Sequence, residues 1–457
     1  MLHILRSLQA DISETTMRHA LTLLLSCFLL LTTANAHATD SYRGAANETA
    51  HWIAASAISE KQGVVWPSDP RDPKSVDTSM YSGTPGPILF FLEAYRYKHK
   101  KEYLTMARRG ADALLASIKH DDPAGLYEGL AGSGFTLGEA YLVTRDKKYL
   151  EGALRTVEWL KQSAHKAEGG VRWSDETDII SGTAGTGLFL LWAEDHLGAK
   201  DVRGLAIEAG DRLITTAQHP ASGQLKWMMN ATFPAEMPNF SHGTGGVAYF
   251  LVTLYQKTGE KRFLEAALAG ARYLTSIADV DGEACLIYHD SRPENKKMYY
   301  LGWCHGPAGT ARFFYRLYQV TKDPQWMQWM TKLATSLTEK RYAGKAVTPG
   351  EWDNVSVCCG VTAQAEFYLN MYQLTRRKDY LDFAHQMSDV LLKKATRDAN
   401  GMRWVQVETR VKPEIAVAQT GLMQGASGIG LWLLHFDAFE TGKRLPSITL
   451  PDNPFTY

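Results

Sequence analysis

The chain has 457 residues, of which 45% are hydrophobic and 21% charged, and it includes 12 Trp, 21 Tyr and 16 Phe. This composition excludes a disordered, collagen-like or coiled-coil protein and predicts a globular chain with a large core. The 49 basic and 49 acidic residues leave no net charge to attract a phosphate backbone, so no nucleic-acid partner is expected. Five cysteines in this length also exclude a disulfide scaffold.

The N-terminal segment, residues 1–38, is predicted to be an extension followed by a cleavable signal peptide. Positive charge after Met17 precedes an apolar run from Ala20 to Leu31, and small residues lead to a cleavage site after Ala38. The run is shorter than the roughly 20 residues that a membrane-spanning helix needs. We therefore expect export to the periplasm or the medium, with no membrane span after cleavage, from a start at Met1 or Met17.

A Gly-x-x-Gly pair recurs seven times, and each pair directly precedes an apolar stretch. The pairs are Gly83/Gly86, Gly129/Gly132, Gly182/Gly185, Gly243/Gly246, Gly306/Gly309, Gly360/Ala363 and Gly425/Gly428. The apolar stretches are hydrophobic nearly all round, which predicts buried helices. Most are followed by an amphipathic stretch that opens with an aromatic residue, which predicts outer helices. Strand-like alternation is confined to linkers, at Ala284–Tyr288 and Met402–Val407.

Seven inner and seven outer helices can bury their apolar faces by closing into a ring. The predicted fold is therefore all-α, an α/α toroid that forms one domain over residues 39–442. Because every inner helix begins at its glycine pair, the seven helix N-termini should meet at one end of the ring, where we expect the chemistry. The C-terminal tail, residues 443–457, carries three prolines and is expected to lie extended over the surface.

Cysteine and histidine residues precede the glycine pairs of three successive repeats. Cys304 lies in the fifth repeat, and Cys358 and Cys359 lie in the sixth. Thiolates near helix N-termini suit a zinc ion. A single buried cysteine is more often a small hydrophobic residue, and the adjacent pair could instead form a vicinal disulfide. Three sulfurs at matching repeat positions favour metal binding.

His242 precedes the fourth glycine pair, and Asp178 lies four residues before the third. Neighbouring repeats meet in the ring, so Asp178 could orient or acidify His242 as an acid–base pair. Helix capping or packing would also account for either residue. His305 follows Cys304 and could be a further acid or base, or a packing residue.

With these motifs the chain resembles the lanthionine synthetase C-like family of peptide cyclases. The most specific are the seven glycine pairs, Trp303-Cys304-x-Gly306, Cys358-Cys359-Gly360 and Ser241-His242-Gly243. The resemblance implies an α/α toroid with one zinc ion. The implied ligands are Cys304, Cys358 and Cys359, the last standing where the family most often has histidine.

The chemistry that the resemblance implies is addition of a peptide cysteine to dehydroalanine or dehydrobutyrine, which gives a thioether ring. By the same resemblance His242 is the acid–base and Asp178 its supporting carboxylate. Tyr300 stands where the family often has arginine, and His305 stands where it often has tyrosine. Enolate stabilisation by that arginine is therefore in question, and His305 could take over part of the task.

Export separates this chain from family members that work beside a cytoplasmic dehydratase, so the substrate stays open between a peptide and a small thiol. Two other functions fit the sequence. Helical toroids also serve glycosidases and lyases, which need two carboxylates about 5–10 Å apart, and the candidate acids are Asp175, Glu176 and Asp178. Alternatively, the chain is a binding scaffold in which zinc only joins the fifth and sixth repeats. Oligomeric state cannot be inferred.

Overall fold

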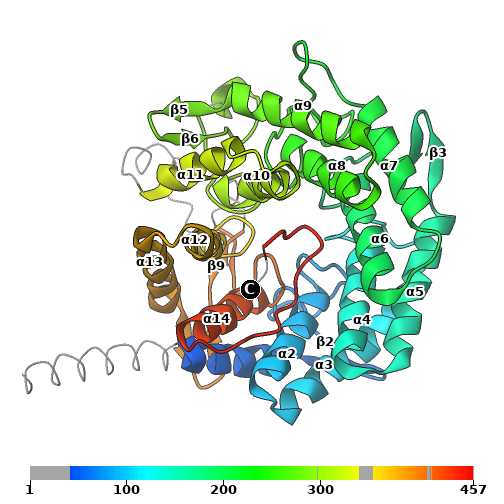
Figure 1. Ribbon diagram of the computed structural model, residues 1–457. Coiled ribbons are helices and arrows are strands. Elements are labelled where there is room, and N and C mark those ends of the chain that lie inside the picture. The colour runs from blue at the N-terminus through cyan, green and yellow to red at the C-terminus, as the bar shows by residue number, and fades with distance from the viewer. Residues whose placement is uncertain (1–41, 296, 339–353, 409–411, 413, 456–457) are drawn as a thin grey trace, which may run out of the picture.

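The computed structural model describes residues 42–455 except positions 296, 339–353, 409–411 and 413. In this part of the chain, helices form an inner ring surrounded by an outer ring (Figure 1), which confirms the predicted all-α toroid. The extension and signal peptide expected at residues 1–38 lie outside the described residues. None of the helices described is both long and apolar enough to cross a bilayer.

The inner ring consists of the helices that follow the glycine pairs. They are α2 (Pro85–Lys98), α4 (Leu130–Thr144), α6 (Thr183–Leu197), α8 (Thr244–Thr258), α10 (Pro307–Thr321), α12 (Val361–Thr375) and α14 (Ala426–Glu440). In all of them except α2, the first glycine of the pair is the N-cap residue. Their first two to three turns are almost entirely buried, as the apolar stretches predicted.

Six outer helices each follow an inner helix in the chain. They are α3 (Lys101–Ser117), α5 (Lys147–Gln162), α7 (Arg203–Thr215), α9 (Lys261–Ile277), α11 (Gln325–Thr338) and α13 (Lys378–Lys394). The seventh outer position is taken by a helix that includes residues 42–55 and packs on α14. The Tyr42 and Phe436 rings lie 4.9 Å apart, and Arg43 Nε lies 3.2 Å from Asp437 Oδ2. The two ends of the helical repeat therefore meet.

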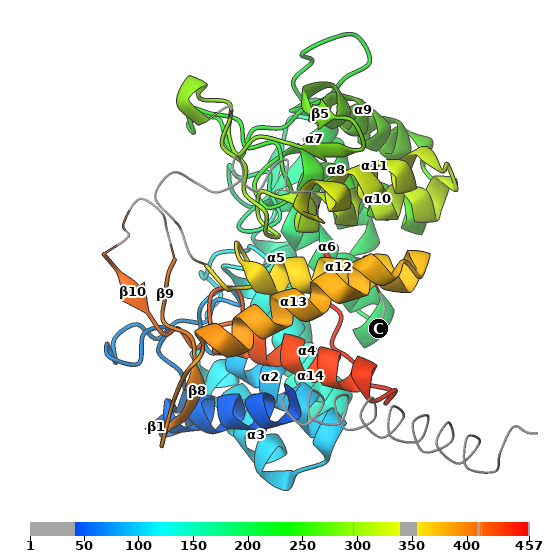
Figure 2. The ribbon, with the colours of Figure 1, turned by 90° about the vertical axis from the view of Figure 1, so that its left-hand side faces the viewer.

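Short antiparallel hairpins connect the helices. They are β1 (Ile58–Glu60) with β2 (Gly63–Val65), β3 (His165–Ala167) with β4 (Gly170–Arg172), β5 (Asp279–Asp281) with β6 (Ala284–Leu286), β7 (Thr396–Asp398) with β8 (Gly401–Arg403), and β9 (Gln406–Val407) with β10 (Ala416–Val417). The strands expected at Ala284–Tyr288 and Met402–Val407 are confirmed as β6, β8 and β9. In Figure 2, β1, β8, β9 and β10 lie at the end of the ring away from the C-terminus.

Both glycines of a pair lie where backbone occupies the space of a side chain. A Cβ on Gly243 would lie 1.8 Å from the Met237 carbonyl oxygen, and a Cβ on Gly309 would lie 1.8 Å from the Trp303 carbonyl oxygen. The loop before each inner helix therefore folds directly against the first turn of that helix. This close approach explains why the glycine spacing repeats while other residues vary.

Backbone hydrogen bonds join these loops into a closed ring. In each loop, the residue two places before the first glycine donates its N–H to the carbonyl of the equivalent residue in the next repeat, at 2.9–3.2 Å. In the third repeat the two roles are split between Ile180, which accepts, and Ile179, which donates. The ring runs through Tyr81, Tyr127, Ile180 and Ile179, Ser241, Cys304, Cys358 and Met423, and returns to Tyr81.

The C-terminal residues 443–455 have no helix or strand, but the expectation that they lie over the surface is wrong. The tail crosses the middle of the ring (Figure 1), and Asp452 is fully buried. Asp452 accepts hydrogen bonds from Tyr127 Oη at 3.1 Å, Trp303 Nε1 at 3.1 Å and Arg312 Nη1 at 3.0 Å. A buried guanidinium needs a carboxylate partner, and the tail supplies one.

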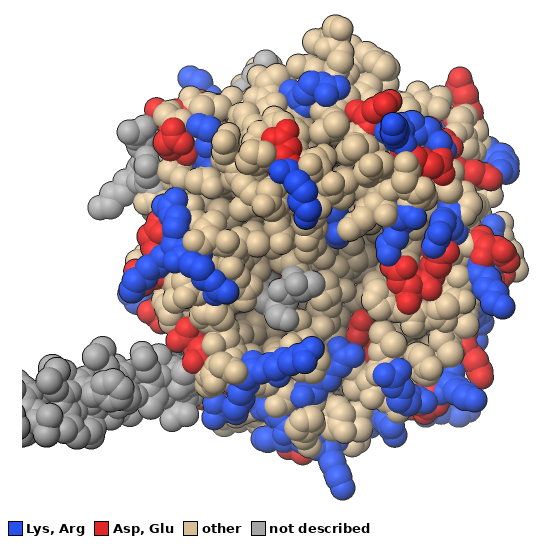
Figure 3. Space-filling model, in the orientation of Figure 1, with Lys and Arg blue, Asp and Glu red and all other residues tan. Residues whose placement is uncertain are grey.

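Figure 3 shows the face of the ring that the C-terminus reaches. Lys and Arg side chains lie among Asp and Glu side chains around its outer part, while the central region is mostly uncharged. The mixture gives this face no extended field of one sign.

We predict that Gly309→Ala lowers the free energy of unfolding by about 1–3 kcal/mol, because the new Cβ would overlap the Trp303 carbonyl oxygen. The matched control is Gly204→Ala in α7, where a Cβ would meet no atom within 4 Å. That variant should be as stable as the wild type or up to about 1 kcal/mol more stable. Denaturant titration followed by circular dichroism measures both, and equal stabilities would contradict the explanation of the glycine pairs.

Asp452→Ala removes the nearest carboxylate from the buried Arg312, so we expect a loss of roughly 3 kcal/mol of stability. Glu366, whose Oε1 lies 3.7 Å from Arg312 Nη2, keeps the loss at the lower end of the range for a broken buried pair. Asp121→Ala, at an exposed position, is the control and should change stability by less than about 0.5 kcal/mol. A wild-type melting curve for Asp452→Ala would show that the tail is not part of the core.

Candidate functional site

A cavity of about 340 Å³ lies at the end of the ring where the inner helices begin. Most of its wall comes from the two positions before the first glycine of a pair, at the end of the ring where the sequence predicted that the helix starts would meet. These residues are Tyr81, Glu128, Ile180, Ser241, His242, Cys304, His305, Cys358, Cys359 and Gln424. The rest of the wall comes from linkers and consists of His289, Arg292, Tyr300 and Glu408.

The structure brings together the sulfurs of Cys304, Cys358 and Cys359. Cys359 Sγ lies 3.1 Å from Cys304 Sγ and 3.3 Å from Cys358 Sγ, and all three sulfurs lie within 4.8 Å of one another. All three thiols are free, so the vicinal disulfide considered for Cys358 and Cys359 is not formed. Sulfur ligands about 2.3 Å from a tetrahedral zinc ion are about 3.8 Å apart. Spacing and donor chemistry therefore both fit zinc.

The backbone ring explains why these sulfurs converge. Cys304 and Cys358 occupy equivalent ring positions in adjacent repeats, and Cys304 N–H donates to the Cys358 carbonyl at 2.9 Å. Cys359 follows directly and its N–H donates to Ser356 Oγ at 3.2 Å. The cysteines are thus held by main-chain bonds that do not depend on a metal.

Hydrogen bonds distribute charge unequally among the thiols. Burial alone would raise the pKa of Cys358, but hydrogen bonds from Cys304, Cys359 and Tyr81 lower it well below its ordinary value. Tyr81 Oη donates to Cys358 Sγ at 3.2 Å, and Gln424 Nε2 donates to Tyr81 Oη at 2.9 Å. Burial raises the pKa of Cys304. The site therefore favours a thiolate on Cys358 before any ion binds.

His242 and Asp178 form a hydrogen-bonded pair beside the sulfurs. His242 Nδ1 lies 2.6 Å from Asp178 Oδ2, and the Asp178 side chain is 1% exposed. The other carboxylate oxygen accepts from the N–H groups of Ser181 and Gly182, both at 2.9 Å. Burial alone would lower the pKa of His242, but the hydrogen bond and charge of Asp178 outweigh burial and raise it. His242 is therefore suited to carry a proton near neutral pH.

His305 also faces the cavity, within a group of aromatic rings. Its ring centre lies 4.4 Å from that of His289 and 5.6 Å from that of His242. Burial, together with the charges of these two histidines, lowers the pKa of His305 well below its ordinary value. A neutral imidazole at this position is not suited to hold a proton for transfer at neutral pH.

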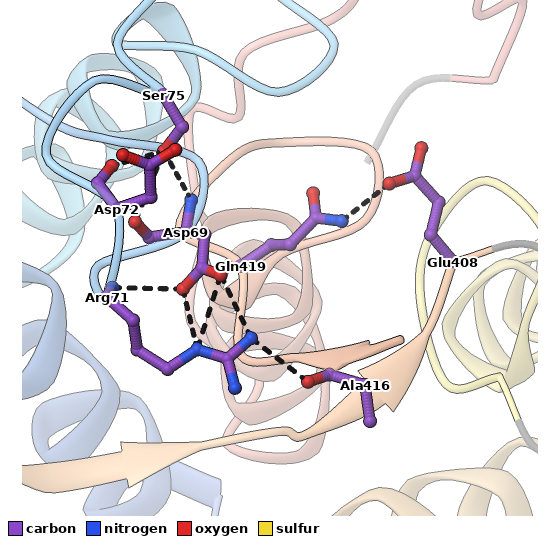
Figure 4. A network of polar contacts seen from close by, with 7 residues as sticks. All are labelled: Asp69, Arg71, Asp72, Ser75, Glu408, Ala416 and Gln419. Atoms are coloured by element: carbon purple, nitrogen blue, oxygen red, sulfur yellow. Dashed lines mark hydrogen bonds and ion pairs between the residues drawn. The ribbon is translucent and has the colours of Figure 1, made fainter. Parts of the chain in front are cut away.

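A polar network fixes the Glu408 side of the cavity (Figure 4). Gln419 Nε2 donates to Glu408 Oε2 at 2.7 Å. Arg71 makes a two-pronged ion pair with Asp69 and donates to the Ala416 carbonyl at 3.2 Å, which ties strand β10 to the loop before α2. Burial raises the pKa of Glu408. No pattern in the sequence indicates these residues, because they lie in linkers outside the repeat.

The acids considered for carbohydrate chemistry do not face one another across this cavity. Asp178 is bonded to His242, Asp175 pairs with Arg172, and Glu176 Oε1 accepts from Asn230 Nδ2 at 3.5 Å. None of the three acids is part of the cavity wall. The carboxylates in the cavity wall are Glu128 and Glu408, so the three acids considered from the sequence do not form a carboxylate pair in this cavity.

A helical toroid with cysteine and histidine at the starts of its inner helices describes a known class of protein. The model of the lanthionine synthetase C-like protein family matches residues 74–450, so the chain belongs to this family.

Nisin cyclase has a similar structure, with a TM-score of 0.58 and 16% identity over 80% of this chain and 89% of that one. An inactive variant of an α-1,6-mannanase from Salegentibacter, in complex with α-1,6-mannotriose, matches with a TM-score of 0.47 and 13% identity over 87% of this chain and 99% of that one. Cellobiose 2-epimerase from Bacillus thermoamylovorans matches with a TM-score of 0.47 and 13% identity over 85% and 95% of the two chains. At 16% identity, the likeness to nisin cyclase is one of fold.

We predict that Asp178→Asn lowers the pKa of His242 by about one unit or more, because burial remains while the carboxylate charge is lost. NMR titration of labelled histidine measures this value, with Asp195→Asn on the surface as the control. An unchanged pKa in Asp178→Asn would contradict the assigned cause. Because the folded-state pKa is raised, the pair stabilises the fold at low pH and loses this effect as pH rises through that pKa. The stability difference from wild type should therefore be larger at pH 6 than at pH 9.

Proposed function

We propose that this protein adds a thiol to a dehydroamino acid and so forms a thioether, with a zinc ion held by Cys304, Cys358 and Cys359. The observation that carries the proposal is that three sulfurs and His242, which is hydrogen-bonded to the buried Asp178, line one cavity in a member of this family. When bound, the zinc ion supplies Lewis acidity and an open ligand position that favour an ionised substrate thiol.

His242 acts as the acid–base that exchanges the proton in this reaction. The thiol loses its proton and its sulfur forms a bond to the β-carbon of the dehydroamino acid, while the electron pair of the C=C bond moves towards the carbonyl. A proton is then returned to the α-carbon, so the addition is balanced with no other reactant. The Nδ1–H group of His242 donates a hydrogen bond to Asp178, which leaves Nε2 of His242 as the atom that exchanges the proton.

Tyr81 and Gln424 position the sulfurs and do not take part in proton transfer. Gln424 Nε2 lies 2.9 Å from Tyr81 Oη and 3.8 Å from Cys359 Sγ, and Tyr81 donates to Cys358. Burial, with the charges of Cys358 and Cys359, raises the pKa of Tyr81 well above its ordinary value, so its hydroxyl stays a donor. Donors of this kind orient metal ligands and moderate their charge.

We also propose that the reaction takes place after export. The support for this is the signal peptide expected at residues 1–38. Under this proposal the thiol and the acceptor must both reach the exported compartment, as a peptide or as a small thiol with its acceptor.

The first variant that tests the function is His242→Gln. We expect it to keep one zinc ion per chain, measured by atomic absorption, and to slow thioether formation by about 100-fold or more. Mass spectrometry of a dehydroalanine substrate mixed with a thiol follows the product. His219→Gln, at an exposed position, is the matched control and should behave as wild type. Full activity of His242→Gln would refute the acid–base assignment.

Cys304→Ala separates catalysis from a purely structural metal. We expect this variant to lose zinc and thioether formation together, because two sulfurs remain from the set of three. Loss of zinc with unchanged thiol addition would refute the proposal. A wild-type protein that binds zinc but forms no thioether would favour the scaffold function instead.

A further inference from the structure

A second organised group of polar residues lies in the linker between β6 and α10, and two of its members, His289 and Arg292, line the cavity. Its centre is Asp290, whose side chain is fully buried. Asp290 Oδ2 accepts from His289 Nδ1 at 2.8 Å, Arg292 Nη2 at 2.7 Å and Asn295 Nδ2 at 2.7 Å. Asp290 Oδ1 accepts from Arg292 Nε and from the Arg292 backbone N–H, both at 3.0 Å. This arrangement is a built site rather than a loose surface loop.

The carboxylate of Asp290 stays ionised. Burial alone would raise its pKa, but hydrogen bonds from Arg292, Asn295 and His289 outweigh burial and lower it far below its ordinary value. The segment is also fixed through its backbone, because Ser291 N–H donates to the Glu236 carbonyl at 2.9 Å and His289 N–H donates to the Met298 carbonyl at 2.8 Å. The group therefore has little freedom to reorganise.

Arg292 is one of the residues that line the cavity, and its guanidinium meets Asp290 along one edge. Nε and Nη2 are turned to Asp290, so the edge formed by Nη1 and Nη2 is the one turned away from it. The side chain is 42% exposed and lines the same 340 Å³ cavity as the three sulfurs. A guanidinium edge of this kind matches the two oxygens of a carboxylate. Because Asp290 already fixes the side chain, little conformational entropy is lost when a ligand binds.

The neighbouring position 300 is occupied by tyrosine, whose ring centre lies 4.2 Å from that of His289. The fifth repeat therefore supplies the cavity with an arginine from the linker, at residue 292, and with an aromatic ring from residue 300. This places a cation near the reacting groups although residue 300 is not basic.

We propose that Arg292, fixed by Asp290, binds a carboxylate of the acceptor, so that the protein selects dehydroamino acids with a free carboxylate over internal residues of a peptide. This inference rests on the proposed thiol addition and names its substrate class. Arg292 determines specificity, and Asp290 is a positioning residue that acts through it.

The test compares two acceptors that differ only in the carboxylate. N-acetyldehydroalanine carries the free acid, and its methyl ester does not. 2-Mercaptoethanol serves as an uncharged thiol, so that any effect of charge comes from the acceptor. In Arg292→Gln we expect KM for the acid to rise about 10- to 100-fold while KM for the ester and kcat for both stay within about twofold. Each variant is compared with wild type on the same acceptor, which cancels the intrinsic difference in reactivity.

Two further variants serve as controls. Arg292→Lys keeps the positive charge but lacks the paired N–H donors of a guanidinium. Its KM for the acid should lie between those of wild type and Arg292→Gln. Arg203→Gln removes an exposed arginine that pairs with Glu194 on the surface, and it should leave both acceptors unchanged. Equal losses on acid and ester, or no loss on either, would overturn the proposal.

A binding measurement separates this inference from the function on which it rests. N-acetylalanine and its methyl ester cannot react, so calorimetric titration reports binding alone. We expect wild type to bind the acid more tightly than the ester and Arg292→Gln to lose this preference. Binding that depends on Arg292 without any turnover by wild type would leave the carboxylate site standing and refute the thiol addition. Turnover by wild type with no dependence on Arg292 would support the thiol addition and refute the carboxylate site.

Discussion

The structure depends on the closed ring of backbone hydrogen bonds that joins the seven loops before the inner helices. Each bond links main-chain atoms of neighbouring repeats, so it forms whatever side chain the position carries. Cysteine, serine, tyrosine, isoleucine and methionine all occupy ring positions in this one chain. The glycine pairs permit the ring, because they let each loop lie directly against its own helix. The hydrogen bonds that hold the fold therefore involve main-chain atoms, while the side chains at the same positions can differ.

Because the ring does not depend on side chains, one cavity can be lined by chemically different groups. Several residues of the ring and several that directly follow it line the same cavity, and the residue type at these positions differs between repeats. The fifth and sixth repeats supply sulfur, while His242 in the fourth and Asp178 in the third form a hydrogen-bonded pair. Linkers supply the remaining groups, Arg292 and Glu408, from segments that the ring does not constrain.

The sequence predicted what the repeat dictates. The glycine spacing placed the inner helices and the end of the ring where the cavity lies, and equivalent repeat positions indicated that Cys304 and Cys358 would meet. It did not predict which segment forms the seventh outer helix, because residues 42–55 precede the first glycine pair. The prolines of the tail predict a surface segment. The tail is buried instead because Asp452 pairs with Arg312, which lies 140 residues away in the chain and leaves no pattern in the sequence of the tail. Arg292 and Glu408 were missed for a related reason: linker residues share no period.

Closure of the ring joins segments that lie far apart in the chain. Tyr81 and Gln424, which are 343 residues apart, are bonded beside the sulfurs, and the helix at residues 42–55 packs on the last inner helix. The cavity wall therefore includes residues of both the first and the seventh repeat. Loss of either repeat would remove a hydrogen-bond donor beside the sulfurs, because Gln424 donates to Tyr81 and Tyr81 donates to Cys358.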